Sequence, residues 1–582
     1  MSSEKQYMLV AAIDFGTTYS GYAFSFRDEF LKDPLKISAN NWNAGSRGLV
    51  SLKTPSCVLF EPSKKFHSFG YEAEDKYAEL ALDNQHQDWF FFWRFKMSLY
   101  KHKHLSRDLM ISDATGKNMP AIDVFACAIQ FLSMDLLQTC KNQVSQIEES
   151  DIRWVLTVPA IWSDAAKQFM RESAEKGGIP SKQLLISLEP EAAAILCRYL
   201  PLDKLSVGSN ALSPFEPGSK YVVIDAGGGT IDMAVHEIQQ SGKIKELYKA
   251  SGGHWGGANV DKAFIDLISE IIGKTVMEEI SKSHTFDLMD LYREFEVKKR
   301  TLVPGQNGKA VFKIPFQFIE VYKLLTGKDV TKTIESIQKY KDSIAMKGDK
   351  MIIDPRVVHT IFSPSCYEIA NHLEDLLEKC ERHDIKTILM VGGFSESRFL
   401  QEQIRTRLPD CRIIIPADPG LAVLKGAVIC GHDPSVVTAR VSRYTYGTCT
   451  MVPFMSKIHP HSKMIKNKRD ETYCKDIFAK IVQIGQSVSS EELHVLQINN
   501  PADEDKDVKD IQLFVSTKAN PTFITDPSCK RIGCLQLDFK TPEHTQKYSV
   551  EVAILTSGTE VTVRVKNKST GETKLENLDF LA

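Results

Sequence analysis

The chain has 582 residues and a mass of 65.4 kDa, so it is too long for a single domain and several lobes are expected. Its 72 Lys and Arg residues nearly balance its 74 Asp and Glu residues, which leaves no basic excess for a large phosphate-binding surface. We therefore expect no nucleic acid as its main partner.

Cysteine spacing and apolar segments bear on location. The twelve Cys residues are scattered without CxxC pairs, which suits reduced thiols. No apolar run approaches the length that spans a bilayer, so no transmembrane segment is expected. The first residues lead into a predicted strand and not into a secretory cleavage site. These features predict a cytoplasmic protein, with the nucleus as a second candidate location.

The first predicted elements are two strands, residues 8–13 and 19–26, joined by the turn D-F-G-T-T. Residues 88–100 then carry the dense aromatic run D-W-F-F-F-W-R-F-K-M-S-L-Y. We expect most of these rings in the core, because large aromatic side chains bury much apolar area. A nucleic-acid stacking platform is the alternative, and the sparse neighbouring charge disfavours it.

Helical and strand patterns alternate over residues 121–199. Ser163 is a natural N-cap for one of the predicted helices. The predicted helices cover residues 121–143, 164–176 and 192–199, and the predicted strands cover residues 153–158 and 184–188.

The sequence Y-V-V-I-D-A-G-G-G-T-I-D at residues 221–232 repeats the pattern of the first hairpin. A buried strand ends at Asp225, three glycines and Thr230 follow, and a second strand begins at Ile231. Glycine has no Cβ, so backbone N–H groups can approach an anion closely. One glycine triplet alone is more often a plain tight hairpin. Two such turns, about two hundred residues apart, predict a nucleotide cleft with a turn on each wall.

A second glycine-dense loop, residues 250–257, precedes further predicted elements. After residue 431 the pattern changes to short apolar runs separated by polar turns, so residues 440–582 are expected to form a β-rich domain of sandwich type. The helices predicted between these two points cover residues 259–273, 286–301, 316–325, 365–379, 398–408 and 421–430, and a strand covers residues 387–391.

The two turns together suggest a phosphate and metal site. Backbone N–H groups of residues 16–18 and 227–230 are expected to donate to phosphate oxygens. Asp14 and Asp225 are expected to hold Mg²⁺ largely through water, because this ion prefers oxygen ligands and keeps several waters.

Three further side chains are candidates for phosphoryl chemistry. Thr230 is expected near the terminal phosphate, Glu189 could orient an attacking water, and Lys96 could stabilise developing charge. A simpler alternative for Lys96 is a side chain that snorkels from the aromatic segment to solvent.

The order of these motifs resembles the superfamily of actin, sugar kinases and heat-shock chaperones, and most closely the heat shock protein 70 family with its divergent heat shock 70 kDa protein 12A/12B branch. The resemblance covers residues 8–430 and implies a two-lobed, actin-like (ribonuclease H-like) α/β ATPase fold with a central nucleotide cleft, followed by a β-rich domain. The matching segments are I-D-F-G-T-T-Y-S at 13–20, L-T-V-P-A-I-W-S at 156–163, L-E-P-E-A-A-A at 188–194, I-D-A-G-G-G-T-I-D at 224–232, F-E-V-K-K-R-T-L at 295–302 and M-V-G-G at 390–393.

The resemblance also implies boundaries and site residues. A nucleotide-binding domain is expected over residues 1–433, with one lobe at about 1–218 and 414–433 and the other at about 219–413. Residues 440–582 would form a substrate-binding β-sandwich without a helical lid. The implied catalytic residues are Lys96, Glu189, Asp225 and Thr230; the implied ATP or ADP contacts are Asp14, Gly16, Thr17, Thr18, Tyr19, Gly227, Gly228, Gly229, Thr230, Gly256, Gly257, Glu296, Lys299, Arg300, Gly392 and Gly393; and the implied Mg²⁺ contacts are Asp14, Asp225 and Asp232.

The chain departs from the family pattern in three places. After Gly393 the family carries a small polar residue and then an arginine that stacks on adenine, whereas this chain has F-S-E. Residues 418–420 are D-P-G in place of Asn-Pro-Asp, and the leucine-rich linker is missing after Gly431. We expect the adenine base to be held differently.

Taken singly, several of these residues also fit simpler roles. Glu296, Lys299 and Arg300 fit a solvated helical face with salt bridges. Thr17 and Thr18 fit ordinary strand positions. The order in which the motifs follow one another favours the nucleotide site.

The function we expect is an ATP-driven, chaperone-like switch with slow Mg²⁺-dependent hydrolysis. Client proteins or peptides would bind the C-terminal β-domain, and co-chaperones of unknown identity are further candidate partners. A nucleotide-binding scaffold or adaptor with little hydrolysis is the alternative, because of the altered linker, the missing lid and Gly420. A small-molecule kinase is disfavoured, since no motif supplies an acidic base for a substrate hydroxyl.

Overall fold

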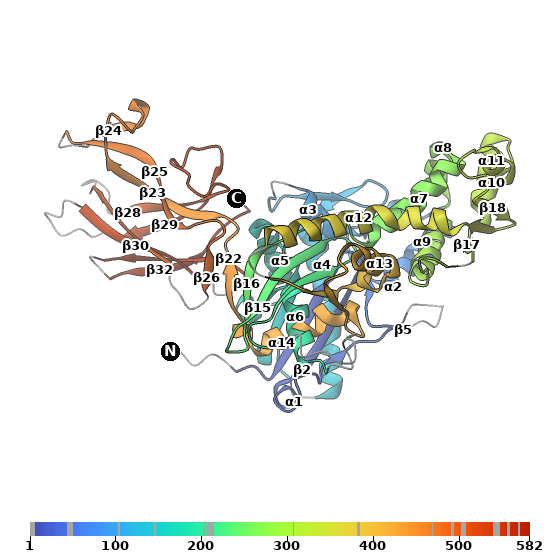
Figure 1. Ribbon diagram of the computed structural model, residues 1–582, viewed down its shortest axis with the longest axis horizontal. Coiled ribbons are helices and arrows are strands. Elements are labelled where there is room, and N and C mark those ends of the chain that lie inside the picture. Colours follow the sequence, from blue (N-terminus) through green and yellow to red (C-terminus); the bar gives the residue numbers. More distant parts are fainter. Residues whose placement is uncertain are drawn as a thin grey trace.

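The computed structural model shows an elongated molecule with a central α/β body (Figure 1). The C-terminal strands lie on one side of this body, and α8 (Lys274–Ser283), α10 (Phe316–Thr326) and α11 (Val330–Ser336) lie at the far end of the other side. The structure describes residues 6–43, 50–102, 105–144, 147–201, 205, 215–306, 308–380, 384–467, 470–489, 494–501, 508–538, 547–555, 559–568 and 571–581.

The first lobe is built on a sheet of order β13-β12-β1-β2-β3, with β6 paired to β2. β12 runs parallel to β1 and to β13, and β2 returns antiparallel to β1. α4 (Ala121–Gln143) and α5 (Asp164–Lys176) supply much of the apolar core that packs on this sheet. The strands are β1 (Leu9–Phe15), β2 (Tyr19–Phe26), β3 (Ser38–Ala39), β6 (Thr54–Pro55), β12 (Ile152–Val158) and β13 (Leu184–Leu188).

The second lobe repeats this plan in a sheet of order β21-β20-β14-β15-β16-β22-β26. β14 and β15 form an antiparallel hairpin like that of β1 and β2, and β20 runs parallel to β14. The strands are β14 (Lys220–Ala226), β15 (Ile231–Ile238), β16 (Ile244–Gly253), β20 (Thr387–Val391), β21 (Arg412–Ile414), β22 (Val437–Val441) and β26 (Ser487–Ser489).

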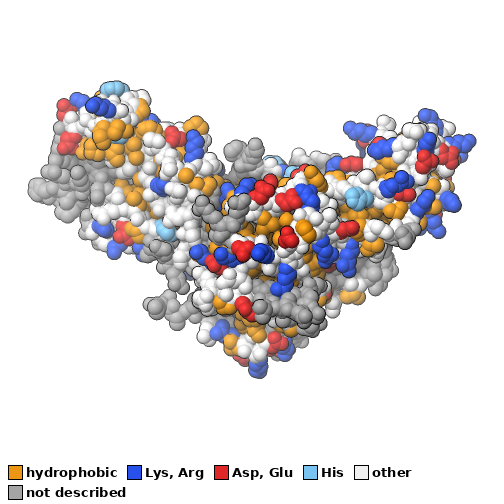
Figure 2. Space-filling model, viewed as in Figure 1, with side chains coloured by type: hydrophobic (Ala, Val, Ile, Leu, Met, Phe, Trp, Pro, Cys, Tyr) orange, Lys and Arg blue, Asp and Glu red, His pale blue; other side chains and the backbone are white. Residues whose placement is uncertain are grey.

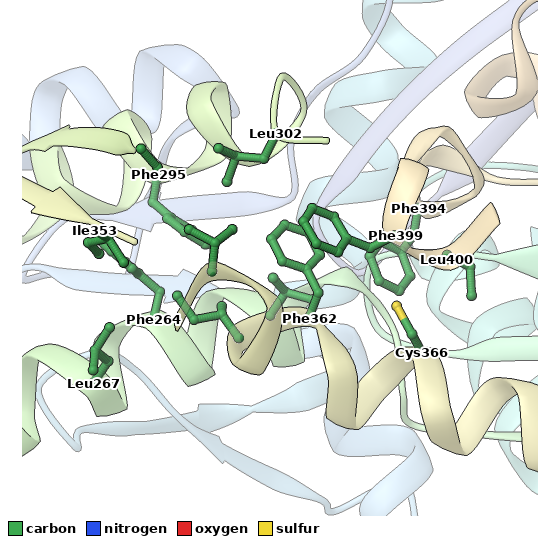
Figure 3. Packing of buried hydrophobic residues seen from close by; sticks show 14 of the residues in the cluster. Phe264, Leu267, Phe295, Leu302, Ile353, Phe362, Cys366, Phe394, Phe399 and Leu400 are labelled. Carbon is green, nitrogen blue, oxygen red and sulfur yellow. The ribbon is translucent and has the colours of Figure 1, made fainter. Parts of the chain in front are cut away.

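Stacked phenylalanines join the helices of the second lobe (Figure 3). Phe264 of α7 (Gly257–Ile272) stacks on Phe295 of α9 (Thr285–Lys299), with ring centroids 4.1 Å apart. Phe362 of α12 (Pro355–Lys379) stacks on Phe399 of α13 (Arg398–Arg407) at 4.3 Å. These helices therefore hold the loops at the ends of β14 and β20 in place.

Two helices pack tightly beneath the cleft. α6 (Glu189–Tyr199) and α14 (Ala422–His432) share an apolar cluster with strands of both sheets. A Cβ on Gly426 would lie 1.8 Å from the carbonyl oxygen of Ala192, so the two helices meet backbone to backbone. This contact fixes the N-terminus of α6, which carries Glu189.

The aromatic segment belongs to the core, as predicted. Phe90, Phe91, Phe92 and Phe95 are buried, and Phe91 stacks on Tyr77 at 4.3 Å. They extend the first lobe through β7 (Cys57–Phe60), β8 (Phe66–Phe69), β9 (Phe90–Trp93) and α2 (Tyr71–Leu82). The remaining short elements of residues 6–432 are α1 (Arg27–Phe30), β4 (Trp42–Asn43), β5 (Val50–Ser51), η2 (His86–Asp88), η3 (Phe95–Met97), α3 (Ser98–Lys101), β10 (Met110–Ser112), β11 (Asn118–Pro120), η4 (Glu149–Asp151), η5 (Ser181–Gln183), β17 (Ala310–Lys313), β18 (Ile344–Lys347), β19 (Lys350–Ile353), η8 (Gly393–Glu396) and η9 (Pro419–Leu421).

The C-terminal region forms two facing sheets around one apolar cluster. Two of its strands lie elsewhere, because β22 pairs with β16 and β26 pairs with β22, so both extend the sheet of the second lobe. In the described part of residues 437–581 there is no α-helix. The elements of this region are η10 (Pro434–Val436), β23 (Thr445–Pro453), η11 (His461–Lys463), β24 (Met464–Lys466), β25 (Thr472–Val482), β27 (His494–Pro501), β28 (Val508–Ser516), β29 (Cys529–Asp538), β30 (Lys547–Leu555), β31 (Thr562–Asn567) and β32 (Thr573–Asn577).

Element bounds from the sequence agree closely where local signals are strong. The side chain of Ser163 accepts a hydrogen bond from Ala166 at 3.2 Å and caps α5, as predicted. The predicted start of α12 at residue 365 is wrong, because the helix begins at Pro355 and continues through Pro364. Proline is disfavoured inside a helix, so the sequence pattern predicts a boundary at Pro364, although the observed helix continues through this residue.

α4 corrects the expectation that no apolar run approaches the length that spans a bilayer. By length and composition it is the one helix among the described residues that meets this criterion. Val124, Phe125 and Ile129 on this helix are fully buried against the first lobe. α4 is therefore a core helix of the fold.

Candidate nucleotide-binding site

A cavity of about 430 Å³ lies between the two lobes. It is lined by the β1–β2 turn, the β14–β15 turn, the start of α6, the end of α9 and the loops that follow β20 and precede α14. Of the predicted site residues, those that line it are Asp14, Gly16, Thr17, Thr18, Tyr19, Lys96, Glu189, Asp225, Gly227, Gly228, Gly229, Thr230, Gly257, Glu296, Lys299, Arg300, Gly392 and Gly393.

The two glycine-containing turns touch each other on the cavity floor. A Cβ on Gly228 would lie 2.2 Å from Thr18 Oγ1, and a Cβ on Gly229 would lie 2.4 Å from Thr17 Oγ1. Side chains at either position would push the lobes apart. Thr17 and Thr18 lie in the turn between β1 and β2, so the alternative that they are ordinary strand residues is wrong.

Gly256 packs against the backbone of the three glycines 227–229 and does not line the cavity. Its N–H donates to the carbonyl of Gly229 at 3.3 Å, and the N–H of Gly257 donates to that of Gly227 at 3.2 Å. A Cβ on Gly256 would lie 2.5 Å from the carbonyl oxygen of Gly228. The glycine pair therefore holds the backbone of the β14–β15 turn in its conformation.

Asp14, at the mouth of the first turn, is held as an ion. Its carboxylate accepts hydrogen bonds from Lys53 at 2.6 Å and from Thr157 at 2.9 Å. Burial raises the pKa of Asp14, but Lys53 outweighs burial with help from Lys96 and Thr157, so the net pKa is lowered.

Asp225, near the end of β14 before the second turn, has the opposite environment. It is buried, and burial together with the nearby carboxylates of Glu189, Asp232 and Asp14 raises its pKa well above the usual value. Asp232 lies outside the cavity lining; its Oδ1 accepts the N–H of Ile161 at 2.7 Å. Its buried Oδ2 has no hydrogen-bond partner among the described residues.

This acidic group fits a divalent cation bound through water. The described residues contain no group of three or more His, Cys, Asp or Glu side chains placed to hold a metal directly. The carboxylates of Asp14 and Asp232 nevertheless lie close enough to Asp225 to raise its pKa, and neighbouring like charges favour a neutralising cation.

Lys96 and Glu189 form a buried ion pair beside this acidic group. Lys96 Nζ lies 2.8 Å from Glu189 Oε1 and 5.1 Å from the ring centre of Trp162. The Lys96 side chain is 2% exposed, so the snorkelling alternative is wrong. Burial raises the pKa of Glu189 to about 7 although Lys96 opposes the shift. A carboxylate with a pKa near neutrality can accept or return a proton.

The other end of the cavity carries the charged end of α9. Lys299 and Arg300 both pair with Glu296, at 2.5 Å and 2.6 Å. The guanidinium of Arg300 also lies 5.5 Å from the ring centre of Tyr19, across the cleft. These three residues thus form the salt-bridged helical face that was the simpler alternative for them, and the same face lines the cavity.

Two residues that hold Asp14 were not among the predicted site residues, and of these only Lys53 lines the cavity. Lys53 and Thr157 matter because they hold Asp14, yet they lie 39 and 143 positions from it in the chain. Only the pairing of β6 and β12 within the first sheet brings them near. Phe394, Glu396, Asp418 and Gly420, in the segments that depart from the family pattern, also line the cavity. The other lining residues, which were not predicted, are Val50, Ser51, Leu52, Phe362, Ser397, Leu421 and Val423.

Comparison with known proteins decides the family. The family model "Hsp70 protein" matches residues 10–509. The chain belongs to the Hsp70 family. The predicted resemblance and fold class, α/β actin-like lobes followed by a β-rich region, are thereby confirmed. Membership of this family supports, in general terms, a nucleotide-binding and chaperone-like protein.

Three relatives illustrate the range of similarity within the Hsp70 family. Mouse (Mus musculus) heat shock 70 kDa protein 12A is 35% identical over 634 aligned residues, which cover 100% of this chain and 93% of the relative. Human (Homo sapiens) heat shock 70 kDa protein 12B is 34% identical over 639, covering 100% and 92%. Chaperone protein dnaK of Cyanidium caldarium is 24% identical over 349, covering 59% and 48%. The full-length similarity is to the 12A/12B branch.

Proposed function

We propose that this protein is an ATP-binding, chaperone-like switch that hydrolyses ATP slowly with Mg²⁺ and couples its nucleotide state to client binding. The observation that carries the proposal is the contact of Gly228 with Thr18 on the floor of a cavity that also contains the buried Lys96–Glu189 pair. Phosphoryl transfer needs positioning and charge neutralisation more than covalent help from the protein. The cavity floor combines backbone N–H donors, the ammonium group of Lys96 and the carboxylate of Glu189, whose pKa lies near 7.

Each group has a definite part in the proposed chemistry. The N–H groups of residues 16–18 and 227–230 would hold phosphate oxygens. Lys96 would stabilise charge on the transferred group, and Glu189 would orient and deprotonate the attacking water. Mg²⁺, when bound, supplies positive charge beside the carboxylates of Asp14 and Asp225.

Contacts of β22 support a link between the cavity and the C-terminal sheets. Arg440 on this strand pairs with Glu191, two residues after Glu189, at 2.7 Å. Arg443 donates to the carbonyls of Ala160 and Trp162, which flank the residue that binds Asp232. If nucleotide binding shifts these segments, the shift would therefore also move β22, the strand that leads into the β-sandwich.

Client binding and location complete the proposal. Edge strands such as β29 and β32 end the two C-terminal sheets, and an extended peptide could add to an edge of this kind. We infer proteins or peptides as clients and co-chaperones as further partners. A cytoplasmic location agrees with twelve Cys residues among which no disulfide bond is formed in the structure.

A nucleotide-binding scaffold with little hydrolysis is the second candidate. It is favoured by the absence of an α-helix in the described part of residues 437–581, since a lid would be needed to hold a client for long. ATP turnover by the full-length protein separates the two.

For the switch, we expect Lys96→Ala to reduce turnover by about 10²–10³-fold, because one preorganised charge contributes that much to a transition state. Asp225→Asn is expected to reduce turnover and to weaken its dependence on Mg²⁺. Lys101→Ala, an exposed lysine on α3, serves as the matched control. Thermal unfolding of each variant checks that it is folded. Wild-type turnover no higher than that of the two variants would favour the scaffold.

A further inference from the structure

Lys53 lines the nucleotide cavity, although the sequence did not predict it as a site residue. It directly precedes β6, which pairs with the start of β2 just after the first turn. In the same segment, the N–H of Ser56 donates to the carbonyl of Thr18 at 2.9 Å, and its hydroxyl donates to that of Gly16 at 2.7 Å. The segment that contains Lys53 is therefore fixed against the turn that is expected to hold phosphates.

A glycine allows the side chain of Lys53 to reach Asp14. Gly21 of β2 lies opposite Asp14 in the register of the first hairpin. A Cβ on Gly21 would lie 3.1 Å from Lys53 Cγ, so the aliphatic part of the lysine passes β2 where the strand has no side chain. Its Nζ then lies 2.6 Å from Asp14 Oδ2.

The ammonium of Lys53 has hydrogen-bond donors to spare. A lysine ammonium carries three N–H donors and no acceptor. Among the described residues, the bond to Asp14 is the one hydrogen bond that Lys53 Nζ donates. The side chain lines the cavity and is 19% exposed. Two N–H donors thus remain for a ligand bound in the cavity.

The charge of Lys53 acts on several walls of the cavity. Burial raises the pKa of Asp225, on the second hairpin, and of Glu396, in the loop after β20, and Lys53 opposes the rise in both. For Asp14, burial and Lys53 are the largest influences on the pKa, and the charge of Lys96 comes next and lowers it further. Two ammonium groups from different segments therefore lie near one carboxylate inside the cavity.

The outer surface carries its charge differently. In the view of Figure 2, the described Lys and Arg side chains are scattered among Asp and Glu side chains. A phosphate chain carries several negative charges, and a charge inside a protein acts on it more strongly than one in bulk water. The two ammonium groups in the cavity are therefore better placed to bind phosphates than the scattered surface cations.

We propose that Lys53 is a nucleotide-binding residue whose ammonium bridges Asp14 and the phosphate chain of the bound nucleotide. Hydrogen bonds between an ammonium and a phosphate oxygen are charge-assisted and therefore strong. This inference rests on the proposed ATP-binding function and adds a second ammonium to that of Lys96. The two turns then differ in their source of positive charge, with a lysine at the first and Mg²⁺ beside the second.

The direct test is labelling of the full-length wild-type protein with acyl phosphates of ATP and of ADP, which carry an acyl group on the terminal phosphate. A lysine amine that lies against this phosphate attacks the acyl carbon. An amide N–C bond forms, the C–O bond to the phosphate breaks, the amine loses a proton, and ATP or ADP leaves. Mass spectrometry of peptides identifies each labelled lysine.

We expect at least one of the two reagents to label Lys53, and an excess of unmodified ATP to suppress this label. Lys36 is the matched control, because it is an exposed lysine of the same lobe that also pairs with a carboxylate, that of Glu29. Any label on Lys36 should be insensitive to ATP.

Affinity supplies the second measurement. Lys53→Met removes the ammonium and keeps an apolar side chain of similar length. We expect its affinity for ATP with Mg²⁺, measured by calorimetric titration, to fall by about 10–100-fold, because a hydrogen bond to a charged group contributes about that much. Lys36→Met should bind ATP like the wild type. Thermal unfolding shows whether each variant is folded, and the labelling of the wild type decides the question if Lys53→Met is not.

The outcomes separate this inference from the proposed function. If the wild type binds ATP but neither reagent gives an ATP-sensitive label on Lys53, the role of Lys53 is overturned and the nucleotide site stands. Unchanged ATP affinity in a folded Lys53→Met protein leads to the same conclusion. If the folded wild type binds neither ATP nor ADP, the proposed function fails, and the role of Lys53 fails with it.

Discussion

The two hairpins that form the cavity floor have the same backbone plan and opposite electrostatics. In the first, Asp14 pairs with Lys53 and is held ionised. In the second, Asp225 is surrounded by carboxylates, and its pKa is raised. The difference teaches that the second hairpin lacks a partner like Lys53: under the proposed function, Mg²⁺ would supply the positive charge there.

The largest effect is expected from breaking the contact between the hairpins. In Gly228→Val the new side chain would collide with Thr18, since even its Cβ would lie 2.2 Å from the Thr18 hydroxyl oxygen. We expect nucleotide affinity to fall by at least about 100-fold, because losing about 3 kcal/mol of phosphate contacts corresponds to that factor. Calorimetric titration measures it.

The matched control is Gly308→Ala, on the surface, where an added Cβ has only Gln306 Nε2 nearby, at 3.9 Å. It should bind nucleotide like the wild type. Unchanged affinity in a folded Gly228→Val protein would show that the two turns do not need to meet.

A pair of substitutions tests the difference between the electrostatic surroundings of Asp14 and Asp225. Lys53→Met leaves the buried carboxylate of Asp14 without its cation and should lower the free energy of unfolding by about 3 kcal/mol. Asp225→Asn removes one of several crowded carboxylates and should stabilise the nucleotide-free protein. Urea denaturation without Mg²⁺ measures both. Effects of the same sign in the two variants would contradict this difference.

The smallest effect concerns pH. The pKa of Glu189 is raised to about 7 on folding, so the folded state binds more protons than the unfolded state between its usual value, about 4.5, and 7. Stability from this group is therefore present in mild acid and is lost as pH rises through 7. Glu246, buried and also raised to about 7, adds to this trend.

We expect Glu189 and Glu246 to contribute about 1–3 kcal/mol more to the free energy of unfolding at pH 5.5 than at pH 7.5 in the absence of ligands. His236 and His432 act in the opposite direction, because burial lowers the pKa of each to about 4 and the folded state then loses stability as pH falls below the usual His value. Asp14 has a lowered pKa, so its contribution is lost only as pH falls through its folded value. The double variant Glu189→Gln, Glu246→Gln should lose this contribution, so its stability relative to the wild type should fall at pH 5.5 and rise at pH 7.5, and urea titrations at the two pH values measure this. An equal change in stability between the two pH values in the wild type and in the double variant would contradict the raised pKa values.

Much of the scaffold was predictable because its signals are local. The predicted bounds of α4, α5, β13 and β20 coincide with the observed ones, since their apolar spacing and capping residues lie within each segment. α12 was predicted ten residues too short because Pro364 interrupts its pattern, although the helix continues around it.

The cavity was predictable only in part. Its glycine turns carry a recognisable spacing, and Lys96 and Glu189 lie in segments that resemble the family. Lys53 lies in a stretch without a motif, and its role depends on a contact with a residue 39 positions away. Glu396 was visible in the sequence as a departure from the family, but its place in the cavity lining, near the charge of Arg300, required the structure.

By itself the sequence determined the two hairpins, because strand alternation and glycine turns are dictated by neighbouring residues. It also determined the α/β class and the family, through the order of the motifs. The tertiary structure alone decided the protonation of each acid, since a pKa depends on burial and on charges that only folding brings close. For that reason Asp14 and Asp225, alike in sequence, differ in the folded protein.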